Sequence, residues 1–152
     1  MVTRHQEKNL SCQQSVRYLG LIVSEGTRAI GPERIKPILN HPLPMTLRQL
    51  RGFWEITGYC HIWIPGYGEL AQRLYKLIAK TQQAQTDKLV WSPETQKAFK
   101  VLQTALLQAP ALSLPTGSEF NLFVTESKGM AFGVLTQPLG PHQQPIAYLN
   151  WK

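Results

Sequence analysis

The spacing of apolar residues changes along the chain and predicts an α+β fold. Residues 16–23, VRYLGLIV, are apolar and partly β-branched, which indicates a strand, and after the turn-forming SEGTR a second short strand is expected at 28–30. Near the other end, stretches 120–124, 132–136 and 145–149 predict three more strands joined by glycine-containing turns. Because nothing after them would cover these three strands, we expect a truncated sheet.

The segments between the strands have helical spacing. Pro32 opens a short helix that is expected to end before Pro42, since the residue preceding a proline is disfavoured in the α region. Thr46 and Gln49 form a capping-box pattern at the start of the clearest helix, expected over 47–64. Its core face is expected to carry Leu50, Phe53, Trp54, Thr57, Cys60 and Ile64.

Two further helices are expected. One covers 69–79 and is followed by the polar stretch 80–88, which we interpret as a hinge. The other begins at Ser92 and runs to about 108. Its apolar stripe is expected to contain Val101, Leu102, Ala105 and Leu106.

Composition favours a folded, basic protein. The 152 residues are 43% hydrophobic and only 16% charged, which is unlike a disordered tail. The formal net charge is +7, and residues 1–80 hold eleven of the sixteen Lys and Arg but five of the nine acids. A basic first half suits a polyanionic partner, although a general solubility bias explains the charge equally well.

The sequence gives no support for a membrane protein, a secreted protein or a metal-binding protein. No apolar run approaches eighteen residues, and the start has no signal-peptide core, so we expect no membrane contact and an intracellular location, cytoplasmic or nuclear. Cys12 and Cys60 are far apart, and the four histidines lack metal-ligand spacing. We therefore expect no metal site and no cofactor.

Catalytic chemistry is missing as well. Two-metal phosphoryl transfer needs two or three carboxylates that converge on Mg²⁺ ions. The chain has a single aspartate, Asp87, inside the polar stretch, and its glutamates are scattered. No phosphate-binding loop, GxSxG or HExxH is present. We expect no catalytic residues and no enzyme activity from this chain alone.

Several long blocks resemble a known family. YLGLIVSEGTRAIGPERIKPIL, LRQLRGFWEITGYCHIWIPGYGELAQRLYKL, VWSPETQKAFKVLQTALLQAPALSLP and FNLFVTESKGMAFGVLTQPLGPHQQPIAYL are similar to consecutive blocks of the reverse transcriptase in gammaretrovirus-type, endogenous retroviral Pol polyproteins. The resemblance covers residues 12–149, in order.

That resemblance implies a domain organisation. Residues 1–30 would be a palm remnant with a primer-grip-like hairpin at Tyr18, Leu19 and Gly20, and 31–90 the helical thumb. Residues 91–152 would be a helix plus a partial RNase H-like connection domain. The catalytic YxDD loop is expected upstream of Met1 and the RNase H domain beyond Lys152. The absent palm, fingers and RNase H portions are then implied partners.

A candidate nucleic-acid surface lies on the helix after Thr46. Arg48 and Arg51 share its outward face with Tyr59, a pattern able to follow a duplex backbone. In the family the corresponding helix packs into the minor groove of the template–primer. The alternative is a solvated helix face with one partly covered aromatic.

Three positions depart from the family pattern. Glu55 stands where the family has glycine on the groove-facing stripe, which adds bulk and negative charge; its milder interpretation is an ion pair with Arg51. His61 stands where arginine is usual, and Thr125 replaces the aspartate of FVDE. These changes fit a decayed endogenous copy.

The sequence thus predicts a fragment of an endogenous retroviral reverse transcriptase that is catalytically incompetent alone and binds a primer–template duplex, such as an RNA–DNA hybrid, weakly and in a salt-sensitive way. One alternative is a protein–protein interaction module. Another is a remnant of a decayed gene with no selected role. The oligomeric state is left open. Support for the interaction module would come from exposed aromatics at Trp54, Trp63, Tyr67 and Tyr75.

Overall fold

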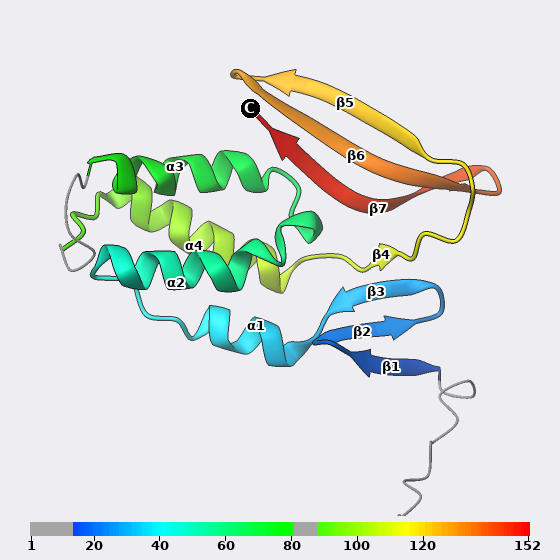
Figure 1. Cartoon of the computed structure of the whole chain (residues 1–152), viewed down its shortest axis with the longest axis horizontal. Coiled ribbons are helices and arrows are strands. Elements are labelled where there is room, and N and C mark those ends of the chain that lie inside the picture. The colour runs from blue at the N-terminus through cyan, green and yellow to red at the C-terminus, as the bar shows by residue number, and fades with distance from the viewer. Residues whose placement is uncertain (1–13, 81–87) are drawn as a thin grey trace, which may run out of the picture.

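The computed structural model describes residues 14–80 and 88–152 and confirms the α+β fold. Within these residues, four α-helices pack together and two antiparallel sheets lie at one end of the helices (Figure 1). No helix in this part of the chain is long and apolar enough to cross a membrane.

The first sheet contains one strand more at its start than expected. β1 (Ser15–Tyr18) and β2 (Leu21–Ser24) form a hairpin, and β3 (Thr27–Ile30) pairs with β2. The chain reverses at Leu19 and Gly20, whose φ angles are 50° and 76°. The single strand predicted from the apolar pattern was wrong, because a leucine in the left-handed region carries no turn signal and the apolar run hides the reversal. The hairpin that the family resemblance implies at Tyr18–Gly20 is present.

A fourth strand completes this sheet from a distant part of the chain. β4 (Leu112–Ser113) pairs antiparallel with β3, with Thr27 opposite Ser113. It was not predicted, because a two-residue strand has no periodicity of its own. Its pairing brings the chain back to the first sheet before the second sheet begins.

The first two helices begin where predicted. α1 (Pro32–Leu39) has proline in its first turn, and α2 (Leu47–Gly58) has the expected capping box. Thr46 Oγ1 accepts a hydrogen bond from the Gln49 backbone N–H at 3.3 Å, and Gln49 Oε1 accepts from the Thr46 N–H at 3.3 Å. Such caps satisfy N–H groups that the first helical turn leaves free.

The end of α2 corrects the prediction. The helix ends at Gly58, and a 3₁₀ turn, η2 (His61–Trp63), follows before the chain reaches Ile64. Cys60 and Ile64 are still buried. The predicted end of the helix was wrong because a 3₁₀ turn retains the i, i+3 spacing of apolar residues. Buried residues therefore continue at helical spacing after the α-helix has ended.

The last two helices follow the prediction closely. α3 (Tyr67–Lys80) and α4 (Pro93–Leu107) are separated by the predicted hinge, most of which (81–87) lies outside the described residues. Val101 is 41% exposed, so its place in the apolar stripe of α4 was wrong. The buried residues of this helix are Ala98, Phe99, Leu102 and Leu106.

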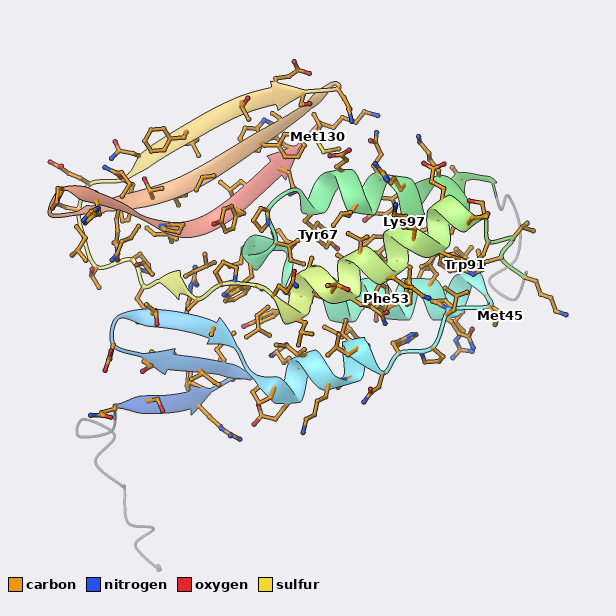
Figure 2. All side chains as sticks on the ribbon, turned by 180° about the vertical axis from the view of Figure 1, so that it is seen from behind. Met45, Phe53, Tyr67, Trp91, Lys97 and Met130 are labelled. Atoms are coloured by element: carbon orange, nitrogen blue, oxygen red, sulfur yellow. The ribbon has the colours of Figure 1, made fainter. Side chains whose placement is uncertain are left out.

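The hydrophobic core lies between the four helices. Phe53 is fully buried, and its ring centroid is 4.6 Å from that of Phe99 (Figure 2). At the end of the bundle remote from the sheets, Trp91 Nε1 donates a hydrogen bond to the Pro44 carbonyl at 2.6 Å. The buried core cluster comprises Ile30, Ile38, Leu50, Phe53, Cys60, Trp63, Ile64, Leu74, Leu77, Leu89, Ala98, Phe99, Leu102, Leu106 and Leu112.

The second sheet contains the three strands that the sequence predicts, each longer than expected. β5 (Asn121–Ser127), β6 (Met130–Leu139) and β7 (His142–Trp151) are antiparallel in the order β5-β6-β7. β7 lies against η2, β4 and α3, whereas β5 is the outer strand (Figure 1).

Arg28 on β3 joins the two sheets. Its carbonyl accepts a hydrogen bond from Trp63 Nε1 at 3.2 Å, and its guanidinium lies 5.5 Å above the Trp63 ring. Its Nη2 donates to the carbonyl of Ile146 on β7 at 3.0 Å. One side chain therefore contacts η2 and the second sheet, while its backbone stays in the first.

The predicted division into 1–30, 31–90 and 91–152 stays a prediction. α4 falls in the last of these parts, yet it packs against α1 and α3 and supplies buried residues to the same core.

Candidate nucleic-acid interface

The predicted primer-grip-like residues form an exposed reverse turn. Tyr18 and Leu19 are 64% and 68% exposed. The turn is tied to the start of α1, because the Gly31 N–H donates to the Gly20 carbonyl at 2.9 Å. A Cβ on Gly31 would lie only 2.8 Å from that carbonyl oxygen, so this close approach requires glycine.

Arg34 on α1 connects the turn to the end of α2. Its Nε and Nη2 donate to the Leu19 carbonyl at 3.2 and 2.8 Å, and its Cζ lies 4.0 Å from the centroid of the Tyr59 ring. A Cβ on Gly20 would run into the Arg34 side chain. The Arg34 guanidinium thus fixes the position of the hairpin turn relative to Tyr59.

The sequence did not reveal this role of Arg34. Its two partners are fifteen and twenty-five residues away, and nothing in the spacing around position 34 marks the residue. The only indication in the sequence was the excess positive charge of residues 1–80, which does not identify Arg34 or any other single residue.

The outward face of α2 carries the predicted cluster. Arg48, Arg51 and Glu55 are exposed, and Tyr59 follows on the same face and is 44% exposed. Within the described residues no ion pair joins Glu55 to Arg51, so the milder interpretation of Glu55 finds no support. Its carboxylate therefore faces solvent between two arginines and an aromatic ring.

His61 lies apart from this surface. Its Nδ1 is 2.5 Å from the Gly58 carbonyl oxygen, and its ring centroid is 6.0 Å from that of Tyr67. It lines a cleft of about 470 Å³ that is otherwise formed by α3 and the ends of β6 and β7. The structure therefore does not bring His61 together with the α2 arginines.

The four aromatics proposed as exposed protein contacts are mostly internal. Trp63 is only 2% exposed, which corrects its assignment as a surface residue. Trp54 stacks on Tyr75 with ring centroids 4.9 Å apart and an angle of 10°. Tyr67 is half-buried, and this burial raises the pKa of its hydroxyl to about 12. Of the four, Tyr75 alone is exposed, at 53%.

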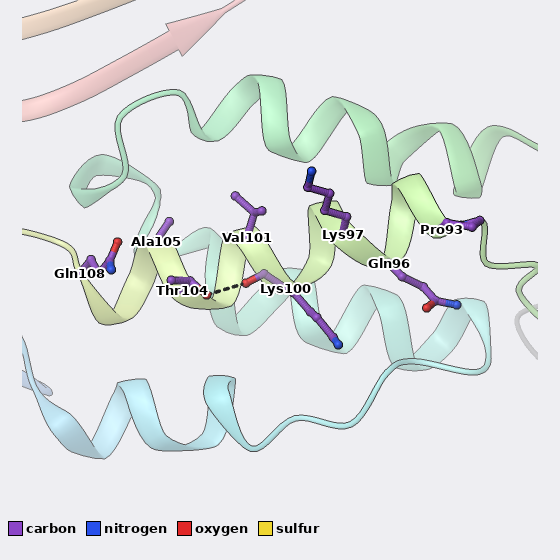
Figure 3. Close-up of a pocket in the computed structure, with 8 residues that line it drawn as sticks. All are labelled: Pro93, Gln96, Lys97, Lys100, Val101, Thr104, Ala105 and Gln108. Carbon is purple, nitrogen blue, oxygen red and sulfur yellow. Dashed lines mark hydrogen bonds between the residues drawn. The ribbon is translucent and has the colours of Figure 1, made fainter.

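A second basic feature lies on the outer face of α4. A shallow groove of about 500 Å³ is lined by this helix, with Lys97 and Lys100 pointing in different directions along it (Figure 3). The residues that line the groove all belong to α4 or its cap, and none belongs to α2. Among the described residues, no three His, Cys, Asp or Glu side chains gather where they could hold a metal.

Comparison with known proteins identifies relatives among retroviral polyproteins. No protein-family model matches the chain. The Gag-Pol polyprotein of avian reticuloendotheliosis virus is 48% identical over 140 residues, and the Pol polyprotein of feline endogenous virus ECE1 is 46% identical over 142. These matches cover 91% and 93% of this chain, which spans only 12% and 13% of the two polyproteins.

Solved structures show the same fold. A foamy viral protease-reverse transcriptase in complex with double-stranded DNA matches 91% of this chain and 24% of that chain, with a TM-score of 0.80 at 22% identity. A complex with an RNA/DNA hybrid matches 91% of this chain and 18% of that one, with a TM-score of 0.77. The chain is therefore a homologue of one segment of retroviral Gag-Pol and Pol polyproteins, and it has the fold of the matching segment of a retroviral reverse transcriptase.

Proposed function

We propose that this chain is a duplex-holding segment of a retroviral reverse transcriptase that binds the backbone of a primer–template weakly and does not catalyse polymerisation by itself. The surface that would contact the duplex consists of the turn at Tyr18–Gly20 and the outward face of α2, with Arg48, Arg51 and Tyr59. We call it the turn–α2 surface.

One observation carries the proposal. Arg34 binds the Leu19 carbonyl and stacks on Tyr59, so the hairpin turn and the end of α2 are held as one rigid surface. Phosphate contacts position a protein on a duplex only when the contacting groups keep a fixed spacing. Because Arg34 already has both partners within the fold, its role in this proposal is to position the surface.

The ligand class also fits the charge of the chain. The foamy viral reverse transcriptases that share the fold were solved with double-stranded DNA and with an RNA/DNA hybrid. Residues 1–80 carry most of the excess positive charge. Neutralising phosphates with this charge releases counterions, so duplex affinity should fall as salt rises, with a slope of log K against log salt of about −2 to −3 for two or three contacts.

Glu55 provides the sharpest test. Replacing Glu55 with glutamine removes a negative charge from the middle of the turn–α2 surface and keeps helix propensity. Repulsion of phosphate at a surface is on the order of a kcal/mol, so binding to a fluorescent primer–template should strengthen several-fold at low salt. Fluorescence anisotropy of the unmodified chain and the variant, measured across a salt titration, gives both the change in duplex affinity and the salt dependence of binding.

Two further variants complete this experiment. Glu55→Gly, which restores the residue of the family pattern, should strengthen binding in the same direction, but it costs roughly 1 kcal/mol of helix stability and must be measured well below the melting temperature. Glu94→Gln is the matched control, because it removes an exposed acid from the start of α4, away from this surface. Equal affinity of the parent and both Glu55 variants at low salt would refute the proposed surface.

The absence of polymerase and RNase H activity is a separate expected result. The chain contains one aspartate, and two-metal catalysis needs several converging carboxylates. Purified protein with primer–template, nucleotides and Mg²⁺ or Mn²⁺ should extend no primer and cleave no RNA–DNA hybrid. Extension above a heat-inactivated control that persists through a second purification would show that this part of the proposal is wrong.

A further inference from the structure

Four side chains between the hairpin turn and the second sheet form an alternating series of cations and aromatic rings. The Arg34 Cζ lies 4.0 Å from the centroid of the Tyr59 ring. The Tyr59 and Trp63 rings are stacked at an angle of 28°, with their centroids 6.3 Å apart. The Arg28 Cζ lies 5.5 Å from the centroid of the Trp63 ring. We call Arg34, Tyr59, Trp63 and Arg28 the cation–aromatic series.

Both ends of the series are attached to backbone carbonyls of other elements. Arg34 Nη2 donates to the Leu19 carbonyl in the hairpin turn at 2.8 Å. Arg28 Nη2 donates to the Ile146 carbonyl on β7 at 3.0 Å. A guanidinium group can make both kinds of contact, because its face lies on a ring while its edge donates hydrogen bonds. The cation–aromatic series therefore connects the exposed turn with the second sheet.

Trp63 is the fixed member of the series. Its side chain is buried, and its Nε1 donates to the Arg28 carbonyl at 3.2 Å. That carbonyl belongs to β3, which is paired with β2 on one side and with β4 on the other, so the acceptor cannot move by itself. An indole that is buried and hydrogen-bonded through its single donor has little freedom to rotate.

Tyr59 is the member of the series that belongs to the turn–α2 surface. It lies at the C-cap of α2 and is partly exposed. A tyrosine in such a position would ordinarily rotate among several side-chain conformations. Here the Arg34 guanidinium and the Trp63 ring both contact it, so its ring keeps one position before any ligand arrives. A ring that is already in place lowers the entropy cost of binding.

We propose that Trp63 and Arg28 are positioning residues for duplex binding at the turn–α2 surface, although neither contacts the duplex. Arg28 is attached to β7 and holds the Trp63 ring, and Trp63 holds the Tyr59 ring. The packing of the second sheet against Arg28 thereby adds to duplex affinity. This role of Trp63 and Arg28 rests on the proposed function, because it requires that a bound duplex meet Tyr59.

Arg28→Lys tests the inner end of the series. The variant keeps the positive charge but loses the planar group that contacts Trp63. The affinity for a fluorescent primer–template, measured by anisotropy at low salt, should fall roughly three- to tenfold. The slope of log K against log salt should stay the same, since no phosphate contact is lost. Arg73→Lys is the matched control, because Arg73 pairs with Glu69 on α3 and lies outside the series. Its duplex affinity should equal that of the parent.

A double-mutant cycle separates positioning from a general loss of stability. Tyr59→Leu removes the ring and should weaken duplex binding by itself. If Arg28 acts through Tyr59, adding Arg28→Lys to Tyr59→Leu should weaken binding by less than about twofold more. Independent effects of the two substitutions would instead multiply. Unchanged affinity of Arg28→Lys, or losses that multiply in the double variant, would overturn the positioning role.

The indole N–H signals of the unmodified chain provide a test without a destabilising substitution. The Trp63 indole is buried, yet its ¹H–¹⁵N signal should shift when primer–template is added, because the Tyr59 ring beside it becomes part of the interface. The Trp91 indole donates to the Pro44 carbonyl at the remote end of the bundle and should keep its signal (Figure 2). Trp63→Phe and Trp91→Phe assign the two signals. A Trp63 signal that stays in place at saturating duplex would also overturn the positioning role.

Failure of this role differs from failure of the proposed function. If Glu55→Gln strengthens duplex binding while Arg28→Lys leaves the affinity unchanged, the turn–α2 surface stands and the series does not position it. If the unmodified chain binds no duplex at low salt, both the surface and the positioning role are wrong.

Discussion

Replacing Phe53 with alanine is expected to lower the free energy of unfolding by about 3–5 kcal/mol. Phe53 is fully buried at the centre of the helical core, where its ring lies against Phe99 and 5.4 Å from the ring of His41. Truncation removes apolar contacts on several sides and leaves a cavity that the packed helices cannot fill. Small domains are stable by only about 5–15 kcal/mol, so the loss is a large fraction of the total.

Urea denaturation followed by circular dichroism measures this loss. Leu107→Ala is the matched control, because Leu107 is the last residue of α4 and is 59% exposed, so its truncation should cost less than about 1 kcal/mol. Both variants must be compared with the parent at the same protein concentration and temperature. A similar small loss for both variants would mean that the helical core is not packed as described.

Hydrogen exchange is expected to divide the chain into two parts of different local stability. Residues 31–110 should exchange more slowly than residues 116–152, because the helices share a buried core whereas both faces of β5 are exposed. Core amides of α2 and α4 exchange through opening of much of the fold, but β5 pairs on one side only within the described residues, so half of its amides lack a strand partner there. A difference of roughly a thousandfold in protection factor separates these extremes.

Residue-level exchange by NMR at low protein concentration makes this measurement. Equal protection of both parts at low concentration would contradict the prediction, because it would require that the second sheet be covered within a single chain.

Helix starts were predictable because their signals are local. Thr46 with Gln49, and Ser92 at the start of α4, satisfy free N–H groups within a few residues, so the sequence contains the whole interaction. The end of α2 was not predictable in the same way. Apolar spacing continues through Cys60 and Ile64. Within the 3₁₀ turn, Trp63 Nε1 donates to the carbonyl of Arg28, a contact with a distant segment that local spacing does not reveal.

The candidate surface was only partly predictable. Helical spacing places Arg48, Arg51 and Glu55 on one face, and the structure agrees. The turn at Leu19 was hidden from the apolar pattern and was implied only by the family resemblance. Arg34 was not recognised because both of its contacts join segments far apart in the chain. Interactions that cross between elements have no periodicity, so pattern analysis identifies faces but not the contacts that join them.

Because of the contacts of Arg28, positions along the chain should differ in how well they tolerate substitution. The carbonyl and the guanidinium plane of Arg28 both contact Trp63, and its Nη2 donates to the Ile146 carbonyl. Its Nε is buried with no hydrogen-bond partner among the described residues. Lysine would keep the backbone carbonyl, but it has no planar group that lies over the Trp63 ring while also donating to the Ile146 carbonyl. Exposed positions outside the turn–α2 surface, such as Leu107, can change one residue at a time. A change at position 28 or 63 is therefore expected to disturb the other, whereas position 146 contributes only a backbone carbonyl that any residue provides.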